Sequence, residues 1–185
     1  MWLRVLAWAS VCALIVPLVG NSQPAHEACE GELREIERVT LDTPLGPAQG
    51  KLCFDDGDSF SIGPTWIRIF GIDAPEMSPS CIRLSPGAPE NCRIGLAALD
   101  ELLDLLIEGA KCEATRKDKH NRWLATCRTT KGIDIGSELV RQGRACAATK
   151  YDRSYIEQQG EAKAAKRGIW APNASYVPSA MCQAR

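Results

Sequence analysis

The sequence predicts an α+β fold that is mainly β, in which a five-stranded barrel of the OB type carries three helices. Its 185 residues are enough for one domain with a sizeable core. Short segments with strand-like patterns are separated by turn residues and lie at 49–55, 58–62, 65–72, 110–116 and 122–129. One helical segment separates the third strand from the fourth, and two more follow the fifth. This order of elements is that of an OB-fold barrel.

The first three strands bring charged residues into an apolar pattern. Asp-Gly is the turn pair of a tight hairpin, so we expect Asp56 and Asp58 at the junction of two antiparallel strands. In the third strand Arg68 shares a face with Trp66 and Phe70, because side chains alternate between the two faces. A half-buried arginine requires an anionic partner. A carboxylate of the protein and a phosphate of a ligand both remain open as that partner.

Three helices are expected, at 94–108, 134–142 and 154–167, and each is followed by a glycine, namely Gly109, Gly143 and Gly168. The first has core leucines at helical spacing, Leu99, Leu102, Leu103 and Leu106. The third has Ser154 as N-cap with Glu157 three residues later, which predicts a capping box. We expect Trp170 to pack back on the barrel.

The N-terminus has the pattern of a secretory signal over residues 1–22, with Arg4 before an apolar run at 5–19. The run is short for a membrane span, and no later segment approaches one. We therefore expect a secreted or periplasmic protein, with a membrane anchor formed by an uncleaved signal as the alternative. The remaining chain is divided into an extension at 23–47, a domain at 48–170 and a tail at 171–185.

Nine cysteines, of which Cys12 falls in the signal, leave eight for as many as four disulfides in an exported protein. Zinc binding is the competing use, but the sequence has no Cys-x-x-Cys pair. Position favours two bonds: Cys81 with Cys92 across a Pro- and Gly-containing loop, and Cys112 with Cys127 on two strands that flank a turn. For the rest, the sequence suggests Cys29 with Cys182 and Cys53 with Cys146.

Four carboxylates and one guanidinium lie within about twenty positions, namely Asp56, Asp58, Asp73, Glu76 and Arg68. A hard divalent cation prefers oxygen ligands, and a phosphate beside it prefers a planar fork of N–H donors. Pro75 favours an extended conformation at Ala74, so a loop could present Asp73, the Ala74 carbonyl and Glu76 together. These residues have the chemistry of a metal-assisted phosphate site. The alternative is a surface hairpin with solvated acids.

The segment 116–122 is the most cationic turn, with four basic residues against one acid. The net charge of −1 gives no general attraction to a polyanion, so any nucleic-acid affinity must come from local charge. A solvated hairpin tip is the alternative interpretation of this run.

Several of these segments together resemble the micrococcal (staphylococcal) nuclease-like, or thermonuclease, family. The similarity spans about residues 48–170 and is carried, in the family's order, by 56–59, 67–76, 118–125, 139–145, 161–163 and 168–170. It implies an OB-fold Ca²⁺-dependent endonuclease, a hydrolase that cleaves phosphodiester bonds in DNA and RNA and leaves 3′-phosphate and 5′-hydroxyl ends. Mg²⁺ and Mn²⁺ are alternatives to Ca²⁺.

The resemblance also implies roles for individual residues. Asp58, Asp73 and the Ala74 carbonyl would bind the metal, with Asp56 acting through a water. Glu76 would be the general base, Arg68 and Arg122 would hold the scissile phosphate, and Lys119 and His120 would touch the nucleic acid. His120 and Asn121 depart from the Tyr-Gly that is usual in the family. We expect a monomer without a stable protein partner. The alternative function is that of a non-catalytic OB-fold nucleic-acid-binding module in the cell envelope.

Overall fold

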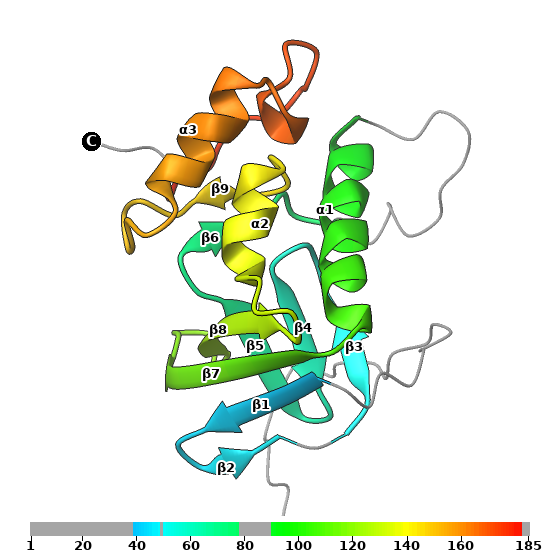
Figure 1. Ribbon diagram of the computed structural model, residues 1–185, viewed down its shortest axis with the longest axis vertical. Helices are drawn as coiled ribbons and strands as arrows, with labels where there is room; N and C mark the ends of the chain where they lie inside the picture. The colour runs from blue at the N-terminus through cyan, green and yellow to red at the C-terminus, as the bar shows by residue number, and fades with distance from the viewer. Residues whose placement is uncertain (1–38, 49, 78–89, 183–185) are drawn as a thin grey trace, which may run out of the picture. The chain divides into compact units, whose positions relative to one another are not determined.

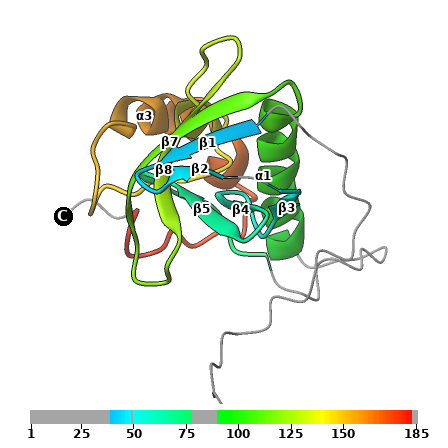
Figure 2. The ribbon, with the colours of Figure 1, turned by 90° about the horizontal axis from the view of Figure 1, so that it is seen from below.

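A curled sheet of seven strands is the centre of the computed structural model, which describes residues 39–48, 50–77 and 90–182 (Figure 1). In spatial order the strands are β2 (Gly46–Pro47), β1 (Val39–Thr43), β7 (Ala110–Lys117), β8 (Trp123–Thr129), β5 (Thr65–Ile69), β4 (Ser59–Ile62) and β3 (Leu52–Phe54). Figure 2 shows the sheet curving around its inner face, with α1 (Glu90–Ile107) along one side. The predicted α+β fold with an OB-like barrel is confirmed.

The sheet is larger than the five strands expected from the sequence. Strand β1 runs parallel to β7, with Leu41 beside Cys112, and β2 pairs with the end of β1. Both strands lie in the segment 23–47 that we had separated from the domain. Leu41 is fully buried, so this part of the chain contributes to the core. All described residues belong to one compact unit, Gly31–Arg185, and the predicted signal at 1–22 lies outside them.

The strand predicted at 65–72 is not continuous, because β5 ends at Ile69 and the chain turns before β6 begins at Ile72. Gly71 has φ +81°, and a Cβ there would lie 3.0 Å from the ring of Tyr155. The following β6 (Ile72–Asp73) pairs with β9 (Cys146–Ala147) in a separate two-stranded sheet. Because of this turn, Asp73 is not part of β5 and lies beside Cys146 instead.

The helices follow the predicted order. In α1, Leu102 and Leu106 are fully buried, whereas Leu99 and Leu103 are only partly buried. Helix α2 (Ile135–Arg141) begins after Asp134, whose carboxylate accepts a hydrogen bond from the Ser137 N–H at 2.9 Å. It contacts α1, β8 and α3 (Ile156–Ala164). Within the described residues, none of the helices is both long and apolar enough to cross a bilayer.

The start of α3 differs from the predicted capping box. The helix begins at Ile156, its N-cap is Tyr155, and no side chain caps it. Ser154 instead donates its backbone N–H to Asp152 at 2.7 Å. Tyr155 is buried and donates its hydroxyl to Asp134 at 3.0 Å, so tertiary packing sets the first turn of α3.

The last predicted packing contact also changes. Trp170 lies in a short 3₁₀ turn, η2 (Gly168–Trp170), and packs against a small apolar cluster that contains Cys146, Ile169 and Cys182. The main hydrophobic core, which contains the buried residues of the sheet, is a different cluster. Trp170 therefore supports the C-terminal tail rather than the barrel.

Two disulfides lie within the described residues. Cys112 and Cys127 are direct partners across β7 and β8, and their bond confirms that pairing. Cys146 is bonded to Cys182, so the suggested pairs Cys29–Cys182 and Cys53–Cys146 are both wrong. The reason is that the C-terminal tail returns to β9. Cys53 and Cys92 are disulfide-bonded as well, and the pairing of Cys92 with Cys81 lies outside the described residues because Cys81 does.

Candidate active site

The bend between β3 and β4 carries Asp56 and Asp58 as expected, but it buries them. Asp56 is 4% exposed and Asp58 is 1% exposed, so the surface hairpin with solvated acids is excluded. The Asp56 carboxylate accepts the backbone N–H of Asp58 at 2.9 Å, which holds the two acids in a fixed relation. The bend itself is closed by the Asp55 N–H, which donates to the Ser59 carbonyl at 3.0 Å.

Gly57 is needed at this bend for space. A Cβ at Gly57 would lie 2.5 Å from the Cβ of Ala98 in α1 and 3.1 Å from that of Ala74. Ala98 is fully buried. Helix α1 therefore packs directly against the bend and keeps the acids of the site away from water.

Arg68 joins the acids of the bend to the acid of β6. Its Nη1 donates to Asp58 Oδ1 at 2.8 Å and its Nη2 to Asp73 Oδ1 at 2.6 Å. The other oxygen, Asp58 Oδ2, accepts the backbone N–H of Ala74 at 2.8 Å. Arg68 is 9% exposed. Of the two partners that the sequence left open for Arg68, a protein carboxylate or a ligand phosphate, this structure has the first. Two carboxylates of the protein bind the guanidinium.

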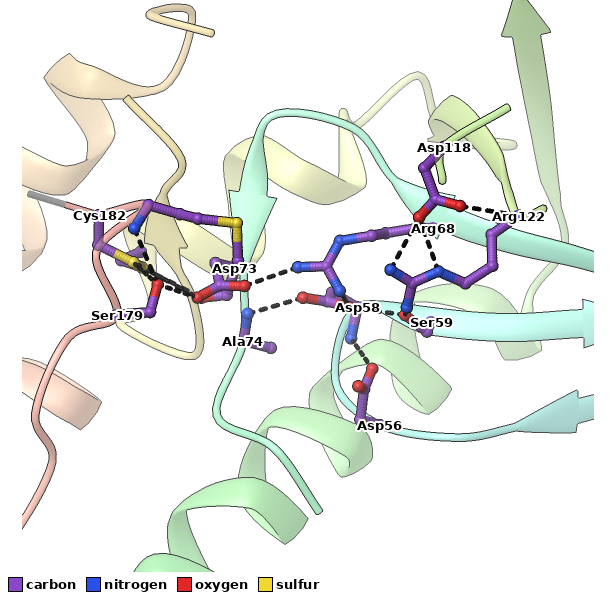
Figure 3. A network of polar contacts seen from close by, with 12 residues as sticks. Asp56, Asp58, Ser59, Arg68, Asp73, Ala74, Asp118, Arg122, Ser179 and Cys182 are labelled. Carbon is purple, nitrogen blue, oxygen red and sulfur yellow. Dashed lines mark hydrogen bonds and ion pairs between the residues drawn. A yellow bond between two sulfur atoms is a disulfide. The ribbon is translucent and has the colours of Figure 1, made fainter. Parts of the chain in front are cut away.

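Arg122 reaches the same cluster from the turn between β7 and β8. Its Nη1 donates to the Ser59 hydroxyl at 3.2 Å, and that hydroxyl donates to Asp58 Oδ1 at 2.7 Å. Figure 3 shows the resulting row of side chains, with Arg122 and Asp118 at one end and Asp73 at the other. The structure therefore brings together both arginines and both principal acids, although they come from four separate segments.

Asp118 is a site residue for which the sequence predicted no role, since it appeared there only as the single acid of a basic turn. Its Oδ2 lies 2.9 Å from both Nε and Nη2 of Arg122, and its Oδ1 accepts the backbone N–H groups of His120 and Arg122. Burial alone would raise the pKa of Asp118, but the hydrogen bonds from Arg122 outweigh it and lower the pKa. An aspartate that starts a turn and binds its own backbone is a known turn signal, and it could have indicated this role.

The other predicted site residues are exposed. Glu76 follows β6 and is exposed, as are Lys119 and His120 at the tip of the β7–β8 turn. Asn121 has φ +66°, a left-handed conformation that asparagine tolerates better than most residues. This conformation is the one that the glycine usual in the resembled family would adopt without strain. Asn121 thus adopts a conformation that a glycine at this position would also allow.

A second residue that the sequence reading missed is Ser179 in the C-terminal tail. Its hydroxyl donates to Asp73 Oδ2 at 2.6 Å. The two residues are 106 positions apart in the sequence, and no local pattern relates them.

The electrostatics of the cluster favour a bound cation. Burial, followed by the charge of Asp56, raises the pKa of Asp58 to about 8. Burial also raises the pKa of Asp56, and partial burial followed by the charge of Asp58 raises that of Glu76. The buried acids Asp56, Asp58 and Asp73 face one buried guanidinium, and every side-chain donor atom they offer is oxygen. Such a set fits a hard divalent cation, which would offset the excess negative charge.

An OB-like barrel with buried acids and two arginines clustered beside one bend defines a protein of the nuclease-like OB-fold class. The family model described as staphylococcal nuclease homologue matches residues 66–172. The chain belongs to this family, which is a family of nucleases. The matched segment contains Arg68, Asp73, Glu76 and Arg122 and begins after the bend with Asp56 and Asp58.

Two curated relatives are similar to more than half of this chain. The succinoglycan biosynthesis protein ExoI of Rhizobium meliloti (strain 1021) is 28% identical over 141 residues, which are 75% of this chain and 71% of that protein. An uncharacterized endonuclease of Haemophilus influenzae (strain ATCC 51907 / DSM 11121 / KW20 / Rd) is 31% identical over 116 residues, 61% of this chain. The match covers 57% of the Haemophilus protein's length.

Proposed function

We propose that this protein is an exported, metal-dependent endonuclease that hydrolyses phosphodiester bonds in DNA and RNA and leaves 3′-phosphate and 5′-hydroxyl ends. The observation that carries the proposal is the continuous row of contacts from Arg122 through Ser59, Asp58 and Arg68 to Asp73. It gathers two guanidinium groups, which can bind a phosphate, and two acids, which can bind a cation, in one cluster. The family and the relative named as an endonuclease support the same reaction class.

Asp58, Asp73 and the Ala74 carbonyl would hold the cation, with Asp56 acting through a water. The backbone at Ala74 lies beside the cluster, since the Ala74 N–H donates to Asp58. We favour Ca²⁺ over Mg²⁺ and Mn²⁺, because a site of several carboxylate and carbonyl oxygens at flexible distances suits the larger ion. The bound cation would polarise the phosphate and help to orient the substrate.

In the proposed reaction a water oxygen attacks phosphorus, the bond from phosphorus to the 5′-oxygen breaks, and the departing 5′-oxygen takes a proton from solvent to become the 5′-hydroxyl. Glu76 accepts the proton that the water loses, and its raised pKa brings it closer to the range of an effective base. Arg122 and Arg68 donate N–H groups to the phosphate oxygens as negative charge accumulates on them. Arg68 must exchange a carboxylate partner for the phosphate in order to do so, since Asp58 and Asp73 hold both of its terminal nitrogens.

The basic turn between β7 and β8 would guide the strand to this site. Lys119 and His120 are exposed at its tip, next to Arg122, and would contact the nucleic acid. A local positive patch of this kind gives affinity that falls as salt concentration rises. The disulfides suit an oxidising compartment, which supports export to the periplasm or the medium. We propose a monomer that needs no protein partner.

The test is nicking of supercoiled plasmid and cleavage of single-stranded RNA by oxidised protein without residues 1–22. We expect cleavage with Ca²⁺ and complete loss of it with excess chelator, restored when Ca²⁺ is returned. End labelling should show a 3′-phosphate. Binding of DNA without cleavage under every metal condition would instead identify a non-catalytic OB-fold binding module.

We also expect the stability of the metal-free protein to fall as pH rises. The pKa of Asp58 is about 8 in the fold against an ordinary value of 3.8, so between these values the native state holds a proton that the unfolded state has lost. The free energy of unfolding should therefore decrease with pH over this window, by at most about 1.4 kcal/mol per pH unit for one proton. The raised pKa values of Asp56 and Glu76 act in the same direction.

Urea unfolding at pH 5 and pH 8, each with chelator or with Ca²⁺, measures this dependence. Ca²⁺ should oppose the loss at pH 8, because the cation and the proton compete for the same carboxylate. Asp58→Asn should flatten the dependence in chelator. A metal-free protein that is equally stable at both pH values would contradict the burial of an ionisable Asp58.

A further inference from the structure

The C-terminal tail is fixed beside the acid cluster by a disulfide. Asp73 and Cys146 are direct partners across β6 and β9, and Cys146 is bonded to Cys182 in the tail. Cys182 is 4% exposed, and its backbone N–H donates to the Ser179 carbonyl at 3.1 Å. The bond therefore holds the turn that contains Ser179 against the strand that contains Asp73.

The Ser179 hydroxyl has a defined orientation within this turn. It accepts the backbone N–H of Met181 at 3.2 Å and donates to Asp73 Oδ2 at 2.6 Å. The other oxygen, Asp73 Oδ1, faces Arg68 at 2.6 Å. Figure 3 shows Asp73 between the tail on one side and Arg68 on the other. Rotation of this carboxylate would weaken both of its short hydrogen bonds, so Ser179 and Arg68 together fix the orientation of its plane.

We propose that Ser179, held by the Cys146–Cys182 disulfide, is a positioning residue that orients Asp73 for cation binding. This inference rests on the proposed role of Asp73 as a metal ligand. Ser179 and Cys182 lie beyond the segment 66–172 that the family model matches. Hydrogen-bond partners that orient a metal ligand commonly change metal affinity or activity by about 10–100-fold.

Tyr176 supports the placement of the tail at the site. It is partly buried and packs against the small apolar cluster that contains Cys146 and Cys182. The Tyr176 hydroxyl lies 4.0 Å from the Cys146 sulfur.

A separate metal site at the disulfide is a weaker interpretation of the same residues. A carboxylate oxygen of Asp73 and the sulfurs of Cys146 and Cys182 lie within 4.8 Å of one another. Metal binding by cysteine uses the thiolate, and the bond between Cys146 and Cys182 leaves neither sulfur in that form. The positioning role needs no such change of state.

The experiment compares Ser179→Ala with Ser179→Thr and with the exposed control Ser175→Ala, using calorimetric titration of each folded protein with CaCl₂. We expect Ser179→Ala to weaken Ca²⁺ binding by about 10-fold. Thr keeps the hydroxyl and should restore most of the affinity, and Ser175→Ala should match the wild type. In plasmid cleavage, Ser179→Ala should need more Ca²⁺ for half-maximal rate but approach the wild-type rate at saturation. Wild-type Ca²⁺ affinity in Ser179→Ala would overturn the inference.

The role of the disulfide is tested by removing it in the double variant Cys146→Ala and Cys182→Ala. We expect this variant to lose Ca²⁺ affinity to a similar degree, and adding Ser179→Ala to cause little further loss, because both changes release the same contact. The matched variant Cys112→Ala with Cys127→Ala should keep its Ca²⁺ affinity. Additive losses from the tail disulfide and Ser179 would show that they act separately and would overturn the coupling.

Asp73→Asn separates failure of this inference from failure of the proposed function. If Asp73→Asn abolishes Ca²⁺ binding while Ser179→Ala has no effect, the ligand assignment stands and the positioning role is wrong. If Asp73→Asn binds Ca²⁺ like the wild type, the proposed ligand set and the positioning role are both wrong.

Discussion

Arg122→Ala should lower kcat/KM for DNA cleavage by about 10²–10³-fold, the usual loss when one donor to developing negative charge is removed. Arg122 is the guanidinium that joins the basic turn to the acid cluster, through Ser59 and Asp58. Its side chain is 20% exposed, so it can meet a substrate without unfolding of the barrel. We therefore expect the variant to fold and to bind Ca²⁺ normally. Steady-state cleavage of a labelled oligonucleotide, with circular dichroism as the check on folding, measures the effect.

Three further variants determine how Arg122 acts. Arg122→Lys should recover little, because an ammonium cannot supply the planar fork that a phosphate engages. Asp118→Asn should cause a smaller loss than Arg122→Ala, since the fork would remain but lose the carboxylate that aligns it at 2.9 Å. Arg128→Ala is the matched control, because Arg128 lies in β8, the strand that follows Arg122, but pairs with Asp134. A wild-type rate for Arg122→Ala would remove this arginine from the mechanism.

Glu76→Gln should lower kcat by about 10²–10⁴-fold, the contribution expected of a general base. Glu76 lies beside the cluster, and its side chain is exposed to solvent but not fully surrounded by it. This partial burial, followed by the charge of Asp58, raises the pKa of Glu76. Glutamine keeps the size of the side chain but cannot accept the proton of the attacking water. Single-turnover cleavage at saturating Ca²⁺ measures the chemical step directly.

The control for this change is Glu157→Gln, because Glu157 is exposed on α3 and its loss removes the same charge. We expect Glu157→Gln to cleave like the wild type. Ca²⁺ affinity should also change little in Glu76→Gln, in contrast to Asp58→Asn. Cleavage by Glu76→Gln at the wild-type rate would assign the base to another group.

Local sequence was a good guide where short-range chemistry sets the structure. The strand pair at 110–116 and 122–129 corresponds to β7 and β8, and the Cys112–Cys127 bond follows from their register. The helix predicted at 134–142 corresponds to α2, and its first predicted residue, Asp134, is the N-cap. These features depend on contacts between residues close in sequence or on a single hairpin, so periodicity and turn residues are enough to predict them.

Local sequence did not predict the features that depend on contacts between residues far apart in the chain. The capping box at Ser154 is absent because Tyr155 is fixed by Asp134 in α2's cap. The suggested disulfide of Cys53 with Cys146 is absent because the tail brings Cys182 to β9. In each case the competing contact comes from another element, and spacing along the chain carries no information about it.

The amino-acid sequence by itself determined the OB-type order of strands and helices, the family resemblance, and the acids and arginines of the candidate site. Periodicity, turn residues and residue chemistry are local properties, and they are written in the chain. Only the tertiary structure decided that Arg68 is held by two carboxylates, that Arg122 meets them through Ser59, and that the tail reaches Asp73. Those contacts join segments as far as 106 residues apart, and only folding of the chain brings them within hydrogen-bond distance.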